Sequence, residues 1–202
     1  MSEAAEQEQV VDERHVSAFP MREKVGRVLW AIVQATLFRW SFHNMYTWRR
    51  MLLQIFGAKI DRTARVRRTV RVECPWNLTI GANSSIGDRA HAYCLGPVAL
   101  GQRVTISQNV HLCAGTHDHR KPDMPLIRPP IEIGDDVWIA ADAYVGPGVR
   151  VGHGALLSER GVALEHLDAW TIYRGNPAQA VKSRKYRSAP ADQSEHETGE
   201  QN

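Results

Sequence analysis

The sequence contains no apolar run long enough to cross a bilayer. The longest run, Val28–Phe38, has eleven residues with one Gln inside it, and Arg27 and Arg39 flank it, whereas a spanning helix needs about 20 residues. Cysteine is also scarce: the three cysteines form no C-x-x-C pair, which favours buried thiols in a reducing compartment. The acidic, polar N-terminus lacks the pattern of a signal peptide, so we expect a cytoplasmic protein.

The two ends of the chain are acidic and lack hydrophobic periodicity. Residues 1–14 hold five acids and one base, and residues 188–202 hold four acids and neither Lys nor Arg. Such segments predict disordered tails. The intervening residues 15–187 hold 24 Lys and Arg against 13 Asp and Glu, a net charge of +11, compared with +3 for the whole chain. A core this basic favours anionic partners such as phosphates or an acidic membrane surface.

A nucleic-acid partner is not expected. The densest basic stretch, Arg62–Arg71, contains five Arg in ten residues, but no aromatic interleaving or nucleic-acid-binding motif accompanies it. We interpret this stretch as a solvated or phosphate-steering face.

A repeat of six residues dominates the middle of the sequence. From Ile133 to Leu156 each block of six opens with Ile or Val, three of four blocks have Gly second, and the fifth residue is small or Val. Helices require a period near 3.6 and half-buried strands a period of two, and neither fits. A period of six predicts a parallel β-helix, in which the first residue points inward and we expect the Gly to allow corner dihedrals.

The frame extends toward the N-terminus with a regular interruption. The inward first positions are Ile60, Val66, Val72, Ile80, Ile86, Ala92, Leu100, Ile106 and Leu112. Extra residues follow every third block: Leu78–Thr79, Val98–Ala99 and 118–132. Three blocks therefore close one triangular coil, and the insertions leave from one corner. The longest insertion begins directly after His117, and function tends to lie beside such an excursion from a rigid scaffold.

The segments on either side of the repeats lack the six-residue period. Between Phe19 and Phe56, three Trp lie among six Lys and Arg, which predicts helices that cover the open end of the β-helix; a helix in a membrane interface is the alternative. After the Gly175-Asn-Pro turn, the residues from Ala178 predict a short basic helix. The expected organisation is an acidic tail (1–18), a helical segment (19–57), a β-helix of about five coils (58–170) with its insertion (118–132), a C-terminal segment with a short helix (171–187) and a second acidic tail (188–202).

Several motifs resemble one enzyme family. They are 106–118 (ISQNVHLCAGTHD), the Val137-Trp138-Ile139 block, Val145-Gly-Pro-Gly-Val149, Gly175-Asn-Pro-Ala178 and, near the N-terminus, Trp48–Ile60. This ordered set resembles the hexapeptide-repeat acyltransferases, and within them the sugar O-acetyltransferases typified by colanic acid biosynthesis acetyltransferases. The resemblance extends from Arg22 to Arg187. It implies a left-handed β-helix, a homotrimer, and acetyl-CoA bound in a cleft between subunits.

The resemblance also implies roles for individual residues. His117 matches the general base, and Tyr93, Cys94 and Asp118 lie where the family contacts the acceptor. The cofactor positions are Trp138, Ala141, Ser158, Arg160 and Gly161 along the pantetheine channel, and Asn176, Pro177, Lys182 and Arg184 near the nucleotide. Two departures stand out: Cys94 replaces the usual Asn, and Glu159 and Glu165 bring negative charge toward an anionic cofactor.

The chemistry suits His117. An imidazole can accept a proton from a sugar hydroxyl near neutral pH and release it later, so direct transfer from the thioester needs no covalent enzyme intermediate. We expect His91, His111 and His153 to be ordinary surface residues. His111, His117 and His119 form an alternative zinc set, but His111 falls at another corner, so we expect no metal.

The expected activity is acetyl-CoA-dependent O-acetylation of a sugar in an exopolysaccharide or surface-glycan precursor, either lipid-linked or nucleotide-activated. A silent β-helix trimer that acts as a scaffold in glycan assembly, and an N-acyltransferase on an amino sugar, are the alternatives. Peripheral contact with the inner face of the cytoplasmic membrane is compatible with the N-terminal segment.

Overall fold

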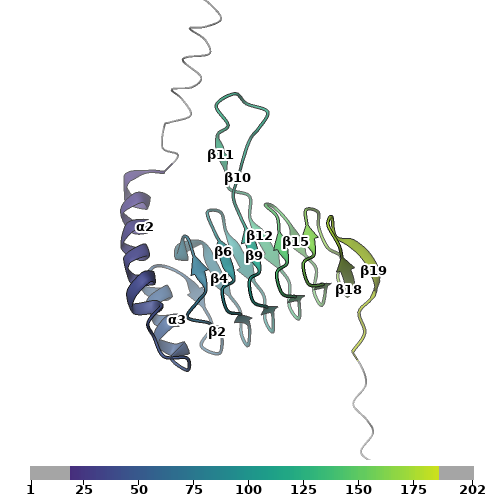
Figure 1. Ribbon diagram of the computed structural model, residues 1–202, viewed down its shortest axis with the longest axis horizontal. Coiled ribbons are helices and arrows are strands. Elements are labelled where there is room, and N and C mark those ends of the chain that lie inside the picture. Colours follow the sequence, from purple (N-terminus) through teal and green to yellow (C-terminus); the bar gives the residue numbers. More distant parts are fainter. Residues whose placement is uncertain (1–18, 187–202) are drawn as a thin grey trace, which may run out of the picture.

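The computed structural model describes residues 19–186; the predicted acidic tails and Arg187 lie outside this range. Figure 1 shows helices at one end of a long prism whose walls are short parallel strands, and a hairpin that projects from its middle. The helical end contains α2 (Met21–Val33), the π-helical turn η1 (Gln34–Phe38) and α3 (Tyr46–Ile55). A short 3-10 turn, η2 (Pro75–Asn77), follows the third strand.

Three parallel sheets form the walls. Sheet A contains β1 (Lys59–Ile60), β4 (Leu78–Ile80), β7 (Val98–Leu100), β12 (Ile131–Ile133) and β15 (Arg150–Val151). Sheet B contains β2 (Arg65–Val66), β5 (Ser85–Ile86), β8 (Thr105–Ile106), β13 (Trp138–Ile139), β16 (Leu156–Leu157), β18 (Thr171–Arg174) and, antiparallel to β18, β19 (Gln179–Ser183). Sheet C contains β3 (Arg71–Val72), β6 (His91–Tyr93), β9 (His111–Cys113), β14 (Tyr144–Val145) and β17 (Val162–Ala163).

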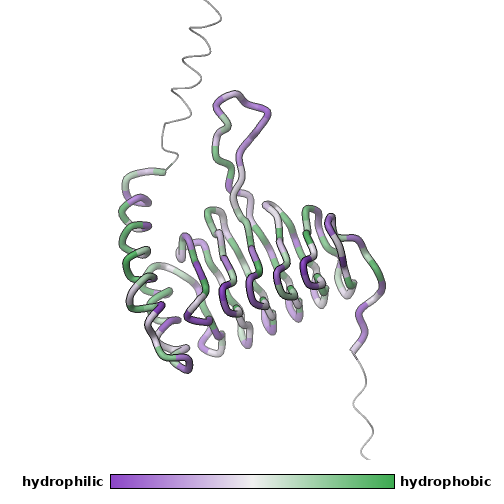
Figure 2. Tube along the Cα trace, viewed as in Figure 1, coloured by the Kyte–Doolittle hydropathy of each residue, from purple (hydrophilic) through white to green (hydrophobic). Residues whose placement is uncertain are grey.

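This architecture confirms the predicted β-helix. The chain runs from sheet A to B to C in each coil, and five full coils are followed by a sixth that begins where Leu167 bridges to Val151. Every inward first position named above is buried, as are the later ones from Ile133 to Ala163. Figure 2 shows the resulting recurrence of hydrophobic positions from coil to coil. The core is therefore a narrow column of aliphatic side chains along the prism.

The glycines at the second position have a different role from the one expected. The left-handed corner falls at the fourth position, where Asn83, Asn109 and Asp142 have φ of 57–59°. Gly134, at a second position, is not in that region, but a Cβ added there would lie 2.8 Å from the backbone nitrogen of His153 in the next coil. Close stacking of successive coils, rather than corner dihedrals, therefore requires Gly at this position.

The N-terminal helices cap the open end of the prism, as predicted. Arg49 is fully buried, and its Nε donates to the carbonyl of Val66 in sheet B at 2.7 Å. Gln54 donates to the carbonyl of Ile60 in sheet A, and Trp30 Nε1 donates to that of Val72 in sheet C. The first strand of each sheet thus gains a side-chain partner from the cap, which satisfies main-chain groups that would otherwise form a free edge. Within residues 19–186, no helix has the length and hydropathy needed to cross a membrane.

The C-terminal segment corrects one prediction. Residues 179–183 form β19 and pair antiparallel with β18, so the expected short helix is absent. The last parallel strand of sheet B is β18, whose outer edge needs main-chain partners, and β19 supplies them by folding back after Gly175. This tertiary requirement overrides the local helical preference of Ala178–Lys182.

The expected buried thiols are found at Cys74 and Cys94, which face each other in successive coils. Both thiols are free and buried, and Cys94 Sγ lies 3.2 Å from the carbonyl oxygen of Cys74. Burial raises the pKa of Cys74 to about 12 and that of Cys94 to about 11. These cysteines are therefore unreactive core residues at neutral pH.

Candidate functional site

His117 lies where the hairpin leaves the prism. The hairpin consists of β10 (Thr116–His117) and β11 (Leu126–Ile127), with His117 opposite Leu126. The Nδ1 atom of His117 lies 2.6 Å from the carbonyl oxygen of Met124. Because a carbonyl oxygen can only accept, Nδ1 carries the proton in this contact and Nε2 keeps its lone pair. The exposed imidazole is therefore oriented with a proton acceptor available to the outside.

The rest of the hairpin holds this arrangement in place. The backbone N–H of Asp118 donates to the carbonyl of Pro125, and its carboxylate accepts the backbone N–H of Arg120. Met124 itself has a left-handed φ of 46°. The carboxylate of Asp118, predicted to contact an acceptor, thus has a role inside the hairpin, while His119 is exposed.

A ladder of aromatic side chains occupies the outer face of sheet C. His91 and His111 stack with centroids 4.7 Å apart, and Tyr144 meets His111 edge-on at 5.4 Å. Tyr93 contacts both imidazoles, at 5.5 and 6.1 Å. The expectation that His91 and His111 are ordinary surface residues is therefore wrong, because each lies half-buried between neighbours one coil away. The twenty-residue spacing between them could have predicted the stack, since the first coils are twenty residues apart.

The ladder continues into charged groups on the first coil. Glu73 lies 2.6 Å from Arg71 Nη2 and 3.4 Å from His91 Nε2. Its interaction with His91, followed by the Arg71 charge, lowers the pKa of Glu73 to about 2 despite burial. Burial, and then the neighbouring His91, lowers the pKa of His111. His111 Nε2 is buried and has no hydrogen-bond partner among residues 19–186.

The two remaining predicted acceptor residues differ in position. Tyr93 lies against Gly115, where an added Cβ would come within 3.3 Å of the ring, so Tyr93 borders the strand that leads to His117. Cys94 is completely buried and faces Cys74. The prediction that Cys94 contacts the acceptor must therefore be revised, because its side chain presents no surface to a ligand.

The predicted pantetheine residues form one strip on the corner between sheets B and C. Ala141 and Arg160 occupy the same corner of successive coils, and the backbone N–H of Arg160 donates to the carbonyl of Ala141 at 2.9 Å. Ser158 and Gly161 belong to the same turn as Arg160. Trp138, on β13, is partly exposed, with its Nε1 3.0 Å from Ser107 Oγ. The turn with Asn176 and Pro177 continues the strip, because Gly175 and Ala178 bond to Val162.

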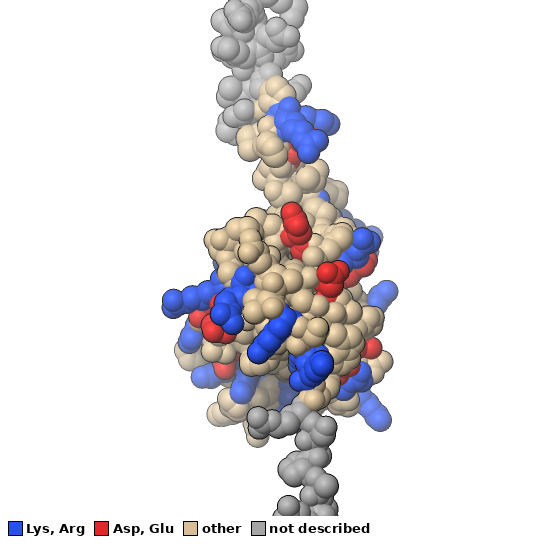
Figure 3. Space-filling model, turned by 90° about the vertical axis from the view of Figure 1, so that its right-hand side faces the viewer, with Lys and Arg blue, Asp and Glu red and all other residues tan. Residues whose placement is uncertain are grey.

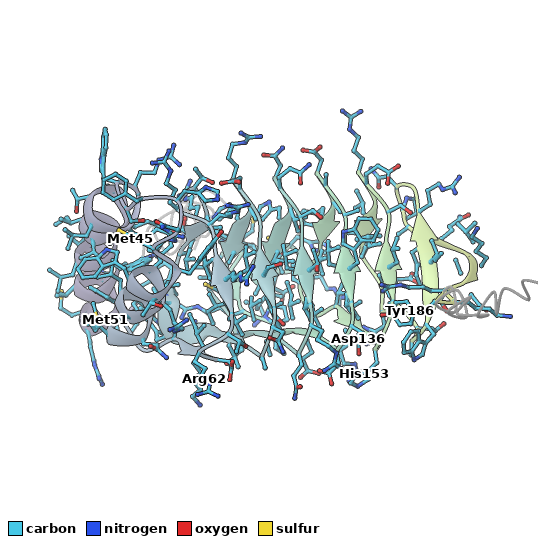
Figure 4. All side chains as sticks on the ribbon, turned by 90° about the horizontal axis from the view of Figure 1, so that it is seen from below. Met45, Met51, Arg62, Asp136, His153 and Tyr186 are labelled. Carbon is cyan, nitrogen blue, oxygen red and sulfur yellow. The ribbon has the colours of Figure 1, made fainter. Side chains whose placement is uncertain are left out.

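The two predicted phosphate-binding residues, Lys182 and Arg184, lie in different surroundings. Lys182, on β19 opposite Ile172, is exposed. Arg184 instead lies at the corner between sheets A and B, where its Nη1 donates to the carbonyls of Asp136, Gly154 and Ala155 at 2.8–3.2 Å. Figure 4 shows Asp136 and His153 along this edge, with Tyr186 at the same end of the prism. Figure 3 shows that Lys and Arg outnumber acids over the C-terminal end.

His117 and the strip occupy different corners. His117 lies between sheets C and A, because β9 precedes it and β12 follows the hairpin. The strip lies between sheets B and C, and the outer face of sheet C separates the two within one chain. No group of three or more His, Cys, Asp or Glu suited to a metal ion occurs in the described part of the chain.

Comparison with known proteins defines the family. The chain is 40% identical over 156 residues to the Escherichia coli (strain K12) protein named "Putative colanic acid biosynthesis acetyltransferase WcaF", a match that covers 77% of this chain and 86% of the relative. The search against family models found no match. The chain belongs to the hexapeptide-repeat acetyltransferase family, and it is an enzyme of the acyltransferase class.

Solved structures share the fold. Galactoside acetyltransferase in complex with coenzyme A has a TM-score of 0.76 at 20% identity, and the match covers 84% of this chain and 86% of that one. The hexapeptide-repeat acetyltransferase VCA0836 of Vibrio cholerae, in complex with acetyl coenzyme A, has a TM-score of 0.74 at 22% identity, over 92% of this chain and 100% of that one.

Proposed function

We propose that the protein is an acetyl-CoA-dependent O-acetyltransferase that acts on a sugar of an exopolysaccharide or surface-glycan precursor, with His117 as the general base. The observation that carries this proposal is the 2.6 Å contact between His117 Nδ1 and the Met124 carbonyl, because it leaves Nε2 as the proton acceptor. The 40% identical relative is named for colanic acid biosynthesis, which supports a glycan precursor as the acceptor.

The reaction requires one proton to move twice. His117 Nε2 removes the proton from the acceptor hydroxyl as its oxygen attacks the thioester carbonyl of acetyl-CoA. The tetrahedral intermediate collapses by breaking the carbon–sulfur bond, and the imidazolium returns the proton to the departing CoA thiolate. The Met124 carbonyl stabilises the imidazolium that forms between the two steps, since it accepts from the Nδ1–H in both states.

The placement of the residues supports a homotrimer. His117 and the strip of Trp138, Ala141 and Arg160 lie on different corners of one prism, so a compact site combines the base of one subunit with the strip of its neighbour. The orphaned Nε2 of His111 supports the same arrangement, because a buried polar atom without a partner points to a missing neighbour or ligand. Ser158, Gly161, Asn176, Pro177 and Lys182 extend the strip toward the nucleotide of acetyl-CoA.

The acceptor is proposed to be a lipid-linked or nucleotide-activated sugar, bound near Tyr93, Asp118 and the outer face of sheet C. We place the protein in the cytoplasm, with peripheral contact at the inner face of the membrane.

Mixed assemblies test the base and the shared site together. His117→Ala and Trp138→Ala homotrimers are each expected to be inactive, whereas trimers refolded from both chains regain about a quarter of the wild-type sites, because each interface draws on two subunits. Acetyl transfer is followed as acceptor-dependent release of CoA, and light scattering gives the assembly. Mixed trimers without activity would contradict the shared site, and a monomer at micromolar concentration would remove the trimer. A wild-type protein whose CoA release no acceptor stimulates would leave only the scaffold alternative.

A further inference from the structure

The outer side of the N-terminal cap is apolar, although it faces away from the protein core. On α2, Met21, Val25, Val28, Leu29 and Ile32 are all more than half exposed. Their spacing places them on one side of the helix, opposite the buried Trp30. An ordinary surface helix has a polar outer side, so this stripe is an exposed feature that requires a partner.

Two aromatic side chains further along the cap are also exposed. Trp40 is 81% exposed and Phe42 is 77% exposed, both in the turn between η1 and α3. Leu37 on η1 is also more than half exposed. We call this surface, made of the five α2 residues with Leu37, Trp40 and Phe42, the end face.

The charges around the end face have one sign. Arg22, Lys24 and Arg39 are exposed beside it, and the helical period places Arg22 and Lys24 on opposite flanks of the stripe. Glu23 is the single acid in residues 19–58. Its carboxylate forms an ion pair with Arg128 at 3.1 Å, on the side of α2 that faces the prism. The end face therefore combines apolar side chains, two exposed aromatic residues and a basic rim without an exposed acid.

We propose that the end face docks on an anionic membrane surface, with the stripe and the Trp40–Phe42 turn inserted at the headgroup boundary. A basic rim around apolar and aromatic side chains is the chemistry that the cytoplasmic leaflet selects. A second copy fits less well, because an end-to-end symmetric contact would bring Arg22, Lys24 and Arg39 against themselves.

The position of the end face suits this partner. Figure 1 shows α2 standing across one end of the prism, whereas the hairpin and the sheet faces lie along its sides. A trimer built side by side, as proposed above, leaves the ends uncovered and presents three end faces in one plane, which multiplies a weak contact. Membrane docking does not depend on the proposed function. Its consequence does rest on that function, namely that the acceptor is lipid-linked and approaches from the membrane.

Vesicle co-sedimentation of the full-length protein tests the proposal without acetyl-CoA or acceptor. We expect binding to vesicles of phosphatidylethanolamine and phosphatidylglycerol to be at least about tenfold tighter than to phosphatidylcholine vesicles, and to weaken with salt. Trp40→Ser/Phe42→Ser should lose about tenfold or more of this binding. The matched control, Leu164→Ser/Val181→Ser, removes two exposed aliphatic residues from the other end and should bind like wild type.

A second set of variants keeps the test independent of folding. Arg22→Gln/Lys24→Gln/Arg39→Gln should lose the preference for anionic lipid, while acetyl transfer to a soluble acceptor stays at the wild-type rate in both end-face variants. If the wild-type protein binds vesicles but shows no acetyl transfer, the result counts against the proposed function and not against the docking surface. The proposal is overturned if the wild-type protein does not bind the anionic vesicles, or if the control pair loses as much binding as the end-face pair. A doubling of the assembly that Trp40→Ser/Phe42→Ser abolishes would identify a second copy as the partner instead.

Discussion

His91 and His111 stack on the outside of sheet C, with their rings 4.7 Å apart and inclined by 14°. They are paired in register on β6 and β9, one coil apart. Two imidazoles this close cannot both be charged without repulsion, and burial adds to the cost for His111. The ladder is therefore sensitive to acid.

Acid is expected to destabilise the fold in two stages. The folded pKa of His111 is lowered from 6.5, so as pH falls below 6.5 the unfolded chain binds a proton that the folded chain resists, and stability falls. The contribution of Glu73 is present above its unfolded pKa of 4.5 and is lost as pH falls toward its folded pKa of about 2. His111→Gln should reduce the loss of thermal stability between about pH 7.5 and 5.5. The exposed His153→Gln is the control, and an unchanged pH dependence in His111→Gln would contradict the first stage.

His117→Ala should lower kcat by about 10²–10⁴-fold, because a general base contributes roughly that much to proton transfer. The imidazole is exposed and outside the core, so the variant should keep its assembly and its affinity for acetyl-CoA. CoA release with and without acceptor measures the effect. His119→Ala, two residues further along the hairpin, should retain most of the activity. A wild-type rate in His117→Ala would refute the assigned base.

We expect Lys182 to contribute to acetyl-CoA binding and Arg184 to contribute to the stability of the fold. Lys182→Gln should raise the KM for acetyl-CoA with little change in kcat, since a distant phosphate contact acts equally on ground and transition states. Arg184→Gln instead removes a donor from three carbonyls and should cost about 1–3 kcal/mol of stability. Calorimetry and steady-state kinetics on both variants distinguish the roles. Equal thermal stability of Arg184→Gln and wild type would show that the three contacts do not stabilise the fold.

Two glycine substitutions test why the repeat uses Gly. Gly134→Ala places a Cβ 2.8 Å from the His153 backbone and should destabilise by about 1–3 kcal/mol through overpacking. Gly148→Asn changes a fourth position with φ of 76°, where the nearest atom to a Cβ is 3.4 Å away. Asn tolerates this region, so Gly148→Asn should cost less than Gly134→Ala. Denaturant unfolding measures both, and the reverse order would restore the explanation from corner dihedrals.

Much of the fold was predictable because the repeat is short. A period of six assigns each residue an inward or outward direction without knowledge of distant contacts, and the buried firsts such as Val66, Ile86 and Ile106 agree with it. The insertion after His117 was predictable for the same reason, since it interrupts the period. Residues 179–183 were not, because their local preference favours a helix while the open edge of β18 favours a strand.

The candidate site was predictable in type but not in geometry. His117 and the strip of Trp138, Ala141 and Arg160 carry recognisable motifs. The contact of His117 with the Met124 carbonyl depends on how the hairpin folds back. The contact of Arg184 with the Asp136 carbonyl depends in the same way on β19. The burial of Cys94 depends on its inward direction in the third position of a block.

The sequence alone specifies the period, the coil, the direction of the core side chains and the place of the insertion, because each depends on residues within about one block of one another. The contacts between side chains of different coils follow only from the complete fold. These contacts join residues 17–48 positions apart in the sequence. They include the stack of His91 on His111 and the hydrogen bonds from Arg184 to Asp136 and from Arg49 to Val66. Such contacts depend on the summed lengths of every intervening coil and insertion, which fix register only once the chain has closed around its core.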